Sequence, residues 1–450
     1  MNVIAPPVTM NPTLQRTCPR IFVASHSSQV AKRLPRPVYH SIVRSTRRIL
    51  SPVTCGTSIR RTATTKTKLT EQPFEEERLP GYSHEQFYPI HIGDTLKSRY
   101  VVVGKLGYGA NSTVWLCRDK TNDEFVAIKV YVKTSQQYVH LEQLAYDHLS
   151  SIRSSHPGRL GIRDLLDWFY LPATDGSRHY CLVHEPLHTT LFNLQRFGGS
   201  PRPFPEDLVK GAISSLLETL DFLHTEASLT HCDIKLSNIM LEIEDTSVHS
   251  TFAENERTDP VPRKVIDERR TIYGSRKLPH PQGHAFGRPI LCDFGEARIG
   301  STFPYTELQP EVYKAPEILL QLPWDHKVDI WNTACVAWDM LQVSHLFDGH
   351  DEEGYHNNRV DIGEMVGLLG HPPMEMQRQS VHSSKVLDEQ GKWKNDPPLS
   401  PDTFEDRLTC LSGQSKAEFL SFLRAMLKWQ PRDRKTAREL LQHPWLTGHT

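Results

Sequence analysis

The segment His231-Cys-Asp-Ile-Lys-Leu-Ser-Asn238 brings three polar side chains together at short spacing. Asp233 places a carboxylate where an attacking hydroxyl needs to be oriented, and Lys235 can lie beside a γ-phosphate as charge develops. Asn238 supplies a hard oxygen donor of the kind that Mg²⁺ prefers. These types of residue in this order predict transfer of a phosphoryl group, with His231 as a packed residue that supports the loop.

A second group of motifs follows in the order that such a reaction needs. Asp293-Phe-Gly295 comes after an apolar run, and Asp293 is predicted to hold a metal ion that bridges the β- and γ-phosphates. Ala315-Pro-Glu317 closes the next segment, and Arg434 is predicted to form a buried ion pair with Glu317. Asp329 is expected to brace the backbone of the loop that carries Asp233.

The segment Gly107-Tyr-Gly-Ala-Asn-Ser-Thr-Val114 precedes these motifs and contains two glycines that let backbone N–H groups approach phosphate oxygens. The third glycine of the usual pattern is Ser112, and a plain hairpin turn would use the glycines in the same way. Lys129 follows in Val-Ala-Ile-Lys, and Glu142, thirteen residues later, is its expected partner. The alternative for both charges is an ordinary place on the surface.

The elements that must position these residues can be predicted from periodicity. Alternating, β-branched stretches predict strands at 100–106, 113–117 and 125–130, and helical spacing over 139–152 places Leu141, Leu144, Ala145, His148 and Leu149 on one side. Beyond residue 205 the pattern is mostly helical. The helices are expected at 206–224, 327–341, 363–369, 416–427 and 436–443. We therefore expect an α+β protein of two lobes, small and β-rich at 87–187 and helical at 188–450.

A polar stretch of about residues 243–288 has little periodicity and is predicted to be an insertion in the larger lobe that forms a surface excursion. The amino-terminal residues 1–86 are predicted to be largely disordered. Residues 1–70 contain twelve Arg and Lys and no Asp or Glu, so the other 380 residues hold 40 basic and 53 acidic side chains, a net charge of −13. Such a basic segment fits either a mitochondrial transit peptide or a tail that contacts anionic surfaces.

The bulk composition excludes two classes of protein. No run of 18 apolar residues is present, so the sequence predicts no transmembrane segment. The eight cysteines are scattered without a Cys-x-x-Cys pair, which favours reduced thiols inside a cell over a disulfide framework or a zinc site. Hydrophobic content of 38% is ordinary for a globular protein. We expect a monomer.

Residues 100–446 resemble the eukaryotic protein kinase family, and within it the SR-protein kinases, particularly those of fungi. The resemblance is carried by the motifs above and by Tyr88-Pro-Ile-His-Ile-Gly93 and Asp329-Ile-Trp-Asn-Thr-Ala-Cys335. It implies a bilobal fold, ATP and Mg²⁺ as cofactors, protein substrates rich in Arg and Ser, and a place in the nucleus or cytoplasm. The residues that it implies for nucleotide binding are Leu106, Gly107, Gly109, Val114, Ala127, Lys129, Glu185, Leu187 and Met240, with Lys129, Glu142, Asp233 and Lys235 catalytic and Asn238 and Asp293 holding metal.

The sequence departs from this family at several positions. His184 stands where a bulky apolar residue usually guards the adenine pocket, Lys314 replaces an arginine, and the residue before Asp233 is Cys232. The acids that dock arginine repeats align with Val360 and Gly367, although the neighbourhood keeps other acids. These are Asp348, Asp351, Glu352, Glu353, Asp361 and Glu364. Two alternatives stay open: a pseudokinase scaffold of the same fold, and a nucleic-acid-binding protein that uses the basic tail.

Overall fold

The computed structural model describes residues 72–134, 140–281, 286–394 and 397–448. All of them belong to one compact unit, Tyr39–Thr450. The predictions about residues 1–70, including disorder and the transit peptide, lie outside the described residues.

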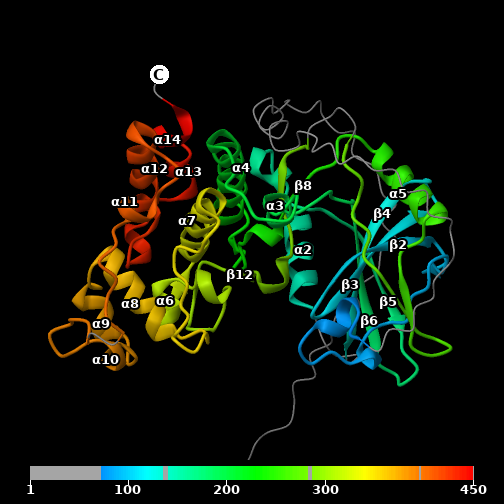
Figure 1. Cartoon of the computed structure of the whole chain (residues 1–450), viewed down its shortest axis with the longest axis horizontal. Helices are drawn as coiled ribbons and strands as arrows, with labels where there is room; N and C mark the ends of the chain where they lie inside the picture. The colour runs from blue at the N-terminus through cyan, green and yellow to red at the C-terminus, as the bar shows by residue number, and fades with distance from the viewer. Residues whose placement is uncertain (1–71, 135–139, 282–285, 395–396, 449–450) are drawn as a thin grey trace, which may run out of the picture. The chain divides into compact units, whose positions relative to one another are not determined.

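A six-stranded antiparallel sheet forms the smaller lobe (Figure 1), with strand order β1-β2-β3-β4-β6-β5. The three strands predicted at its centre are confirmed, and in their register Val114 lies opposite Lys129. Apolar side chains of one face of the sheet, among them Val102, Trp115 and Ile128, form a separate core. The strands are β1 (Thr95–Leu96), β2 (Tyr100–Gly109), β3 (Ser112–Asp119), β4 (Phe125–Thr134), β5 (Leu165–Pro172) and β6 (Arg178–His184).

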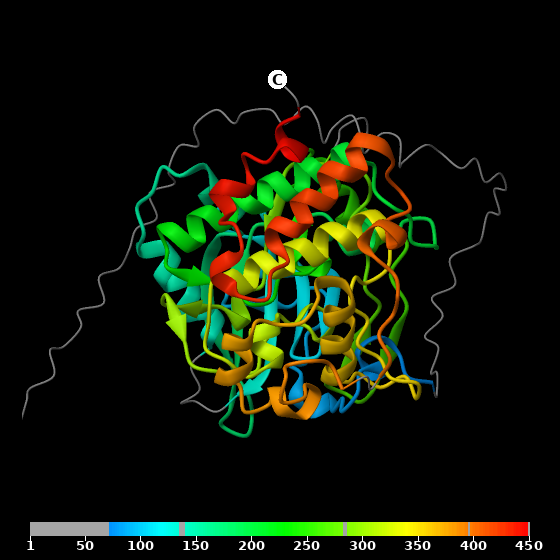
Figure 2. The same ribbon diagram turned by 90° about the vertical axis from the view of Figure 1, so that its left-hand side faces the viewer.

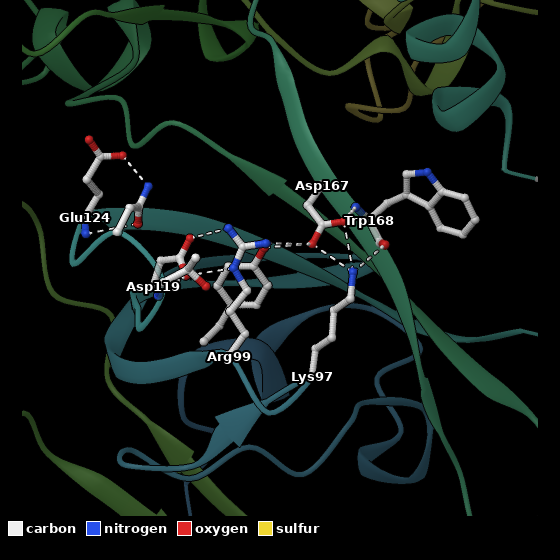
Figure 3. Close-up of polar contacts among 9 residues, drawn as sticks. Lys97, Arg99, Asp119, Glu124, Asp167 and Trp168 are labelled. Carbon is white, nitrogen blue, oxygen red and sulfur yellow. Dashed lines mark hydrogen bonds and ion pairs between the residues drawn. The ribbon is translucent and has the colours of Figure 1, made fainter. Parts of the chain in front are cut away.

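The two edges of this sheet are tied to each other (Figure 3). Lys97, in the turn after β1, pairs with Asp167 of β5 at 2.8 Å, and Tyr100 donates a hydrogen bond of 2.7 Å to the same carboxylate. Arg99 holds Asp119 through two hydrogen bonds and lies 3.8 Å from Asp167. Since β1 and β5 are the edge strands, these contacts curl the sheet and cover edges that would otherwise offer unpaired backbone groups.

Helix α2 (Leu141–Ser151) is the predicted helix of the smaller lobe, and its buried face matches the predicted one in part. Ala145 and Leu149 are buried as predicted, whereas Leu141 and Leu144 are 40% and 45% exposed. Glu142 is buried because its carboxylate pairs with the amine of Lys129, which offsets the cost of its burial.

The larger lobe is built around α7 (Lys327–Gln342), which is buried on all sides from Lys327 to Leu341. Figure 2 shows α7 between α4 (Glu206–Thr225) and α12 (Gly413–Met426). The predicted helix at 363–369 begins earlier, because Asn357 caps α8 (Asn358–Leu369) by accepting a hydrogen bond from Arg359 N. The remaining helices are α3 (Leu191–Gln195), α6 (Pro316–Leu319), α9 (Met374–Gln379), α10 (Ser383–Val386), α11 (Phe404–Arg407), α13 (Ala437–Leu440) and α14 (Pro444–Thr447).

Short strand pairs within the larger lobe flank the segments that carry Asp233 and Asp293. Strand β8 (Ile239–Leu241) pairs with β11 (Pro289–Leu291), directly after the Asp233 loop and directly before Asp293. Strand β7 (Leu229–Thr230) pairs with β12 (Arg298–Ile299), and β13 (Thr302–Phe303) pairs with β14 (Trp324–Asp325). Each pairing holds one end of a loop that carries functional side chains.

The described residues of the insertion form regular structure and pack on the smaller lobe, a placement that the sequence pattern did not indicate. It contains α5 (Ser247–Thr258) and the hairpin of β9 (Arg263–Val265) and β10 (Thr271–Tyr273). Figure 1 shows α5 beside β2, and Phe252 of α5 is fully buried there. The few apolar residues of this polar stretch, among them Phe252 and Leu278, form a small core with Leu116 of the sheet.

Regular backbone also begins before the predicted boundary at residue 87. Two 3₁₀ turns, Glu75–Arg78 and His84–Gln86, precede the sheet, and Glu76 is buried. The sequence signal fails here because the segment is held by charged contacts with the insertion, far along the chain. Within the described ranges, no helix is both long and apolar enough to cross a membrane.

Candidate active site

A cleft of about 450 Å³ collects residues of both lobes. Its walls include the glycine-rich segment, the ends of β3 and β4, helix α2 and the loop after β11. Of the predicted nucleotide-binding residues, the cleft is lined by Leu106, Gly107, Gly109, Val114, Ala127, Lys129, Leu187 and Met240, and also by Glu142, Asn238 and Asp293. The fold therefore brings into one cavity residues that lie up to 187 positions apart in the sequence.

Glu185 is the one predicted nucleotide-binding residue that is not part of these walls. It lies between the cleft residues His184 and Leu187, and its backbone carbonyl accepts a hydrogen bond of 3.0 Å from Arg163. The cleft also contains residues that sequence reasoning missed, notably Arg276, Lys277, Leu278 and His280. They come from the insertion, whose polar composition carried no signal for a place beside a nucleotide.

Lys129 lies between two carboxylates. Its amine is 3.0 Å from Glu142 Oε2 and 3.0 Å from Asp293 Oδ1, so the predicted pair of Lys129 and Glu142 forms. Burial acts to lower the pKa of Lys129, but the two carboxylates outweigh it and the pKa is raised. The same amine overcomes the effect of burial on Asp293 and lowers its pKa. Lys129 is therefore a permanent cation and Asp293 an anion at neutral pH.

The catalytic loop holds Asp233 in a fixed orientation. Lys235 Nζ lies 2.8 Å from Asp233 Oδ2, and Asn238 Nδ2 donates to the same carboxylate at 2.7 Å and to the Asp233 carbonyl at 2.9 Å. Because the amide nitrogen of Asn238 is used in this way, its carbonyl oxygen is what it can offer to a cation. The Asp233 carboxylate thus lies beside Lys235, whose positive charge could stabilise negative charge on a transferred phosphoryl group.

Asp329, at the start of α7, supports this loop from beneath as predicted. Its carboxylate accepts hydrogen bonds from the backbone N–H of His231 at 2.8 Å and of Cys232 at 2.9 Å. Burial acts to raise the pKa of Asp329, but His224 and these donors outweigh it and the pKa is lowered. His231 is fully buried and lies edge-on against Phe294, in agreement with a packing role.

The predicted ion pair of Glu317 and Arg434 is present and almost fully buried. Arg434 donates two hydrogen bonds, of 2.8 and 2.6 Å, to the Glu317 carboxylate, and a third of 2.9 Å to the Lys327 carbonyl. Arginine suits this position because its fork of donors matches a carboxylate and satisfies carbonyls at the same time. The pair fixes the end of the segment that begins at Asp293.

His184 lines the cleft as a neutral side chain. It is buried, its Nδ1 lies 2.8 Å from the Asp164 carbonyl, and burial lowers its pKa well below the usual range. The ring of Tyr146 lies 5.3 Å away. His184 thus takes the place of an apolar wall residue with its polarity satisfied by the backbone.

ATP and Mg²⁺ fit the residues that are present. A Cβ atom added at Gly107 or Gly109 would meet no other atom within 4 Å, so the space beside both glycines is open. Phosphate oxygens could approach the backbone through this space because glycine has no Cβ. Asp293 and Asn238 together form an oxygen donor set suited to Mg²⁺. Bound ATP would supply the phosphoryl group. Asp233 would then orient the accepting hydroxyl, and Lys129 and Lys235 would lie along the phosphates.

The chain belongs to the protein kinase family. The family model for the protein kinase domain matches residues 100–268 and 277–446. The fold agrees, since a crystal structure of a kinase domain superposes with a TM-score of 0.59 at 23% identity and covers 81% of this chain and 100% of that one.

Its relatives make it a serine/threonine protein kinase. A serine/threonine protein kinase of Aspergillus fumigatus is 40% identical over 373 residues, which cover 83% of this chain and 90% of the relative. The serine/threonine-protein kinase SRPK of Physarum polycephalum is 28% identical and covers 83% and 91%. SRSF protein kinase 3 of the mouse is 24% identical, and the match covers 83% of this chain and 90% of the relative.

Proposed function

We propose that this kinase uses ATP and Mg²⁺ to phosphorylate serine within Arg-rich segments of proteins, in the manner of SR-protein kinases. The names of the two more distant relatives above point in this direction. The observation that carries the substrate class is a group of three carboxylates around the buried Asp361, namely Glu311, Asp348 and Glu364, which we call the acidic group.

The acidic group gathers residues from three segments of the chain. Glu364 of α8 accepts hydrogen bonds from the backbone N–H of Asp348 at 2.8 Å and of Gly349 at 3.2 Å. Burial raises the pKa of Asp361 to about 8, and the negative charges of Glu364, Asp348 and Glu311 add to the rise against Lys314. A pKa raised in part by like charges indicates a region that favours a cation.

This region is connected to the catalytic loop through the segment before Ala315. A hollow of about 210 Å³ is lined on one side by Lys235 and Ser237 and on the other by Pro310, Val312 and Tyr313. Glu311 lies in the same short turn, Glu311–Tyr313, and is exposed. A peptide that presents serine to Asp233 would therefore pass close to Glu311, and arginines on the peptide would meet the acidic group.

The proposal can be tested with two peptides that differ only in the residues that flank serine, arginine in one and glutamate in the other. With Mg²⁺ and ATP, the arginine peptide should show the higher kcat/KM, and the advantage should shrink as salt shortens the Debye length to about 8 Å at physiological ionic strength. Glu311→Gln should reduce the advantage. Glu389→Gln, which removes an exposed carboxylate outside the acidic group, is the matched control. Equal rates on both peptides would refute the substrate class.

A further inference from the structure

Lys105, next to the glycine-rich segment, is a fully buried cation. Its side chain is 0% exposed, it forms an ion pair with Glu76, and it donates a hydrogen bond of 3.1 Å to the Tyr273 carbonyl. The Glu75 carboxylate is 3.9 Å away. A lysine is almost never fully buried unless it is paired, so the ion pair with Glu76 is a structural contact. It joins three parts of the chain: the segment before the sheet, strand β2 and the insertion.

The insertion also holds the backbone of β2 at the same point. Arg276 N donates a hydrogen bond of 2.9 Å to the Lys105 carbonyl. The ring of Phe252 lies against Gly104, where an added Cβ would be only 2.8 Å from it. Arg276 itself is fixed to α5 by Glu256 at 2.7 Å. Strand β2 is thus supported through the Lys105 side chain and through the backbone of Gly104 and Lys105.

Strand β2 needs such support because its pairing with β3 is irregular on both sides of Lys105. The register shifts between Val102 and Gly104 and again between Lys105 and Gly107. Each shift interrupts the hydrogen-bond ladder and bends the strand. The residue that follows, Leu106, lines the nucleotide cleft and packs with Leu278 of the insertion, so a change in the position of β2 changes the cleft.

We propose that Glu76 and the contacts of the insertion with β2 form a brace that positions the glycine-rich strand for nucleotide binding, with Lys105 and Glu76 as its positioning residues. The inference rests on the proposed use of ATP. If the amine of Lys105 loses its carboxylate, it moves toward water and takes β2 with it. The wall formed by Leu106 and Gly107 then shifts, and nucleotide affinity falls. The groups that act on the acceptor, Asp233 and Lys235, lie on the other lobe and keep their positions.

The test compares Glu76→Gln with Glu77→Gln in the full-length chain. Glu77 lies in the same 3₁₀ turn but pairs with Lys264 at 2.8 Å, away from β2. Glu76→Gln should raise the Kd of a fluorescent ADP analogue and the KM for ATP by about fivefold or more, with kcat at saturating ATP within about twofold, since one charged hydrogen bond in a buried site is worth that much. Glu77→Gln should leave both constants near those of the wild type.

Two truncations provide a second, independent comparison. A chain that begins at residue 72 retains Glu75–Glu77 and should bind the ADP analogue as the full chain does, whereas a chain that begins at residue 87 should bind it several-fold more weakly. If Glu76→Gln does not fold, Phe252→Leu takes its place and should show the same rise in Kd. An unchanged Kd in folded Glu76→Gln or Phe252→Leu protein would refute the proposed brace. ADP binding without ATP turnover in the wild type would instead count against the proposed function and leave the comparison of Kd values valid.

Discussion

At the scale of single residues, the site depends on charges whose states are set by their neighbours. Lys129 stays protonated because two carboxylates outweigh its burial, and the pKa of Asp329 is lowered because His224 and the backbone N–H of His231 donate to its carboxylate. Burial acts against the charged form of both groups. Removing one partner therefore has effects beyond the loss of one contact, since it leaves a charge without compensation.

Asp233→Asn should separate nucleotide binding from phosphoryl transfer. The amide oxygen can still accept from Asn238, but it cannot act on the proton of the acceptor hydroxyl, so we expect kcat to fall by roughly 10²–10⁴-fold. ATP affinity should stay within a few-fold of the wild type. Asp293→Asn, which removes a carboxylate beside Lys129, should impair both. Steady-state kinetics and nucleotide titration provide the measurement, and near-normal turnover by Asp233→Asn would refute its assignment.

Cys232 predicts activity without phosphorylation of the segment between Gly295 and Ala315. Kinases that are switched on by phosphorylation there hold the phosphate with an arginine, but Cys232 is fully buried and its thiol can only contact the Thr230 carbonyl, 3.6 Å away. Lys129 and Glu142 are already paired. Protein treated with phosphatase and then freed of it should keep most of its activity. Complete loss would contradict the prediction, and mapping would then identify the site among Ser301, Thr302, Tyr305 and Thr306.

Asp361→Asn should stabilise the protein, and more so as pH rises. The pKa of Asp361 is raised to about 8, above about 3.9 for an unfolded chain, so the folded state binds the extra proton between these values. Stability contributed by this group is complete below pH 4 and decreases as pH rises toward 8. The difference in Tm between variant and wild type should therefore be larger at pH 8 than at pH 5. A difference that stays constant across this range would show that Asp361 does not titrate there.

Among the elements, the segment that follows Asp293 is held at both ends by regular structure. The segment from Asp293 to Glu317 begins after β11 and ends at the buried pair with Arg434. Helix α8, which starts at its own cap, carries Asp361 and Glu364 beside Glu311. The Glu317–Arg434 pair is therefore structural, whereas Glu364 and Glu311 lie where they could face a substrate.

Helix α8 also predicts how the enzyme handles repeated sites. Val360 and Gly367 stand where the resemblance places docking acids, so an Arg–Ser repeat should be held only near the cleft and released between events. With peptide in excess, singly phosphorylated species should accumulate before multiply phosphorylated ones, in a time course followed by mass spectrometry. Fully phosphorylated peptide beside untouched peptide at early times would show that the enzyme stays bound.

At the scale of the whole molecule, charge is divided between a basic amino-terminal segment and an acidic remainder. Residues 1–70 carry twelve basic charges, whereas the rest has a net charge of −13. Opposite charge near a cleft raises the local concentration of a basic substrate and its rate of association. The same charge would also attract the chain's own tail, which contains serine and arginine.

Deletion of residues 1–70 should leave folding and catalysis intact, because every motif and the whole brace lie beyond it. Activity on an arginine peptide should match that of the full chain at high salt and equal or exceed it at low salt, where the tail competes most strongly. A fusion of residues 1–70 to a fluorescent reporter tests the transit peptide. Diffuse fluorescence would count against import, and an insoluble truncated kinase would contradict the first expectation.

The family, the order of the catalytic motifs and most of the strands and helices around them could be predicted from the sequence. These features are local: alternation, helical spacing and short motifs are written in neighbouring residues. Even the partnership of Glu317 with Arg434 followed from motifs, because each occupies a fixed place in its own segment.

The exposure of Leu141 and Leu144 on α2, the turns before residue 87 and the place of the insertion could not be predicted from the sequence, because they depend on long-range contacts. Glu142 lies inward against Lys129 of β4, as the motifs predicted, but Glu76 pairs with Lys105, whose amine also donates to the Tyr273 carbonyl in the insertion. Phe252 is an aromatic residue in a polar stretch, and the sequence does not indicate that it packs against Gly104 of β2. Each of these outcomes depends on a long-range pairing of charge or shape, and such a pairing leaves no periodicity in the sequence on either side.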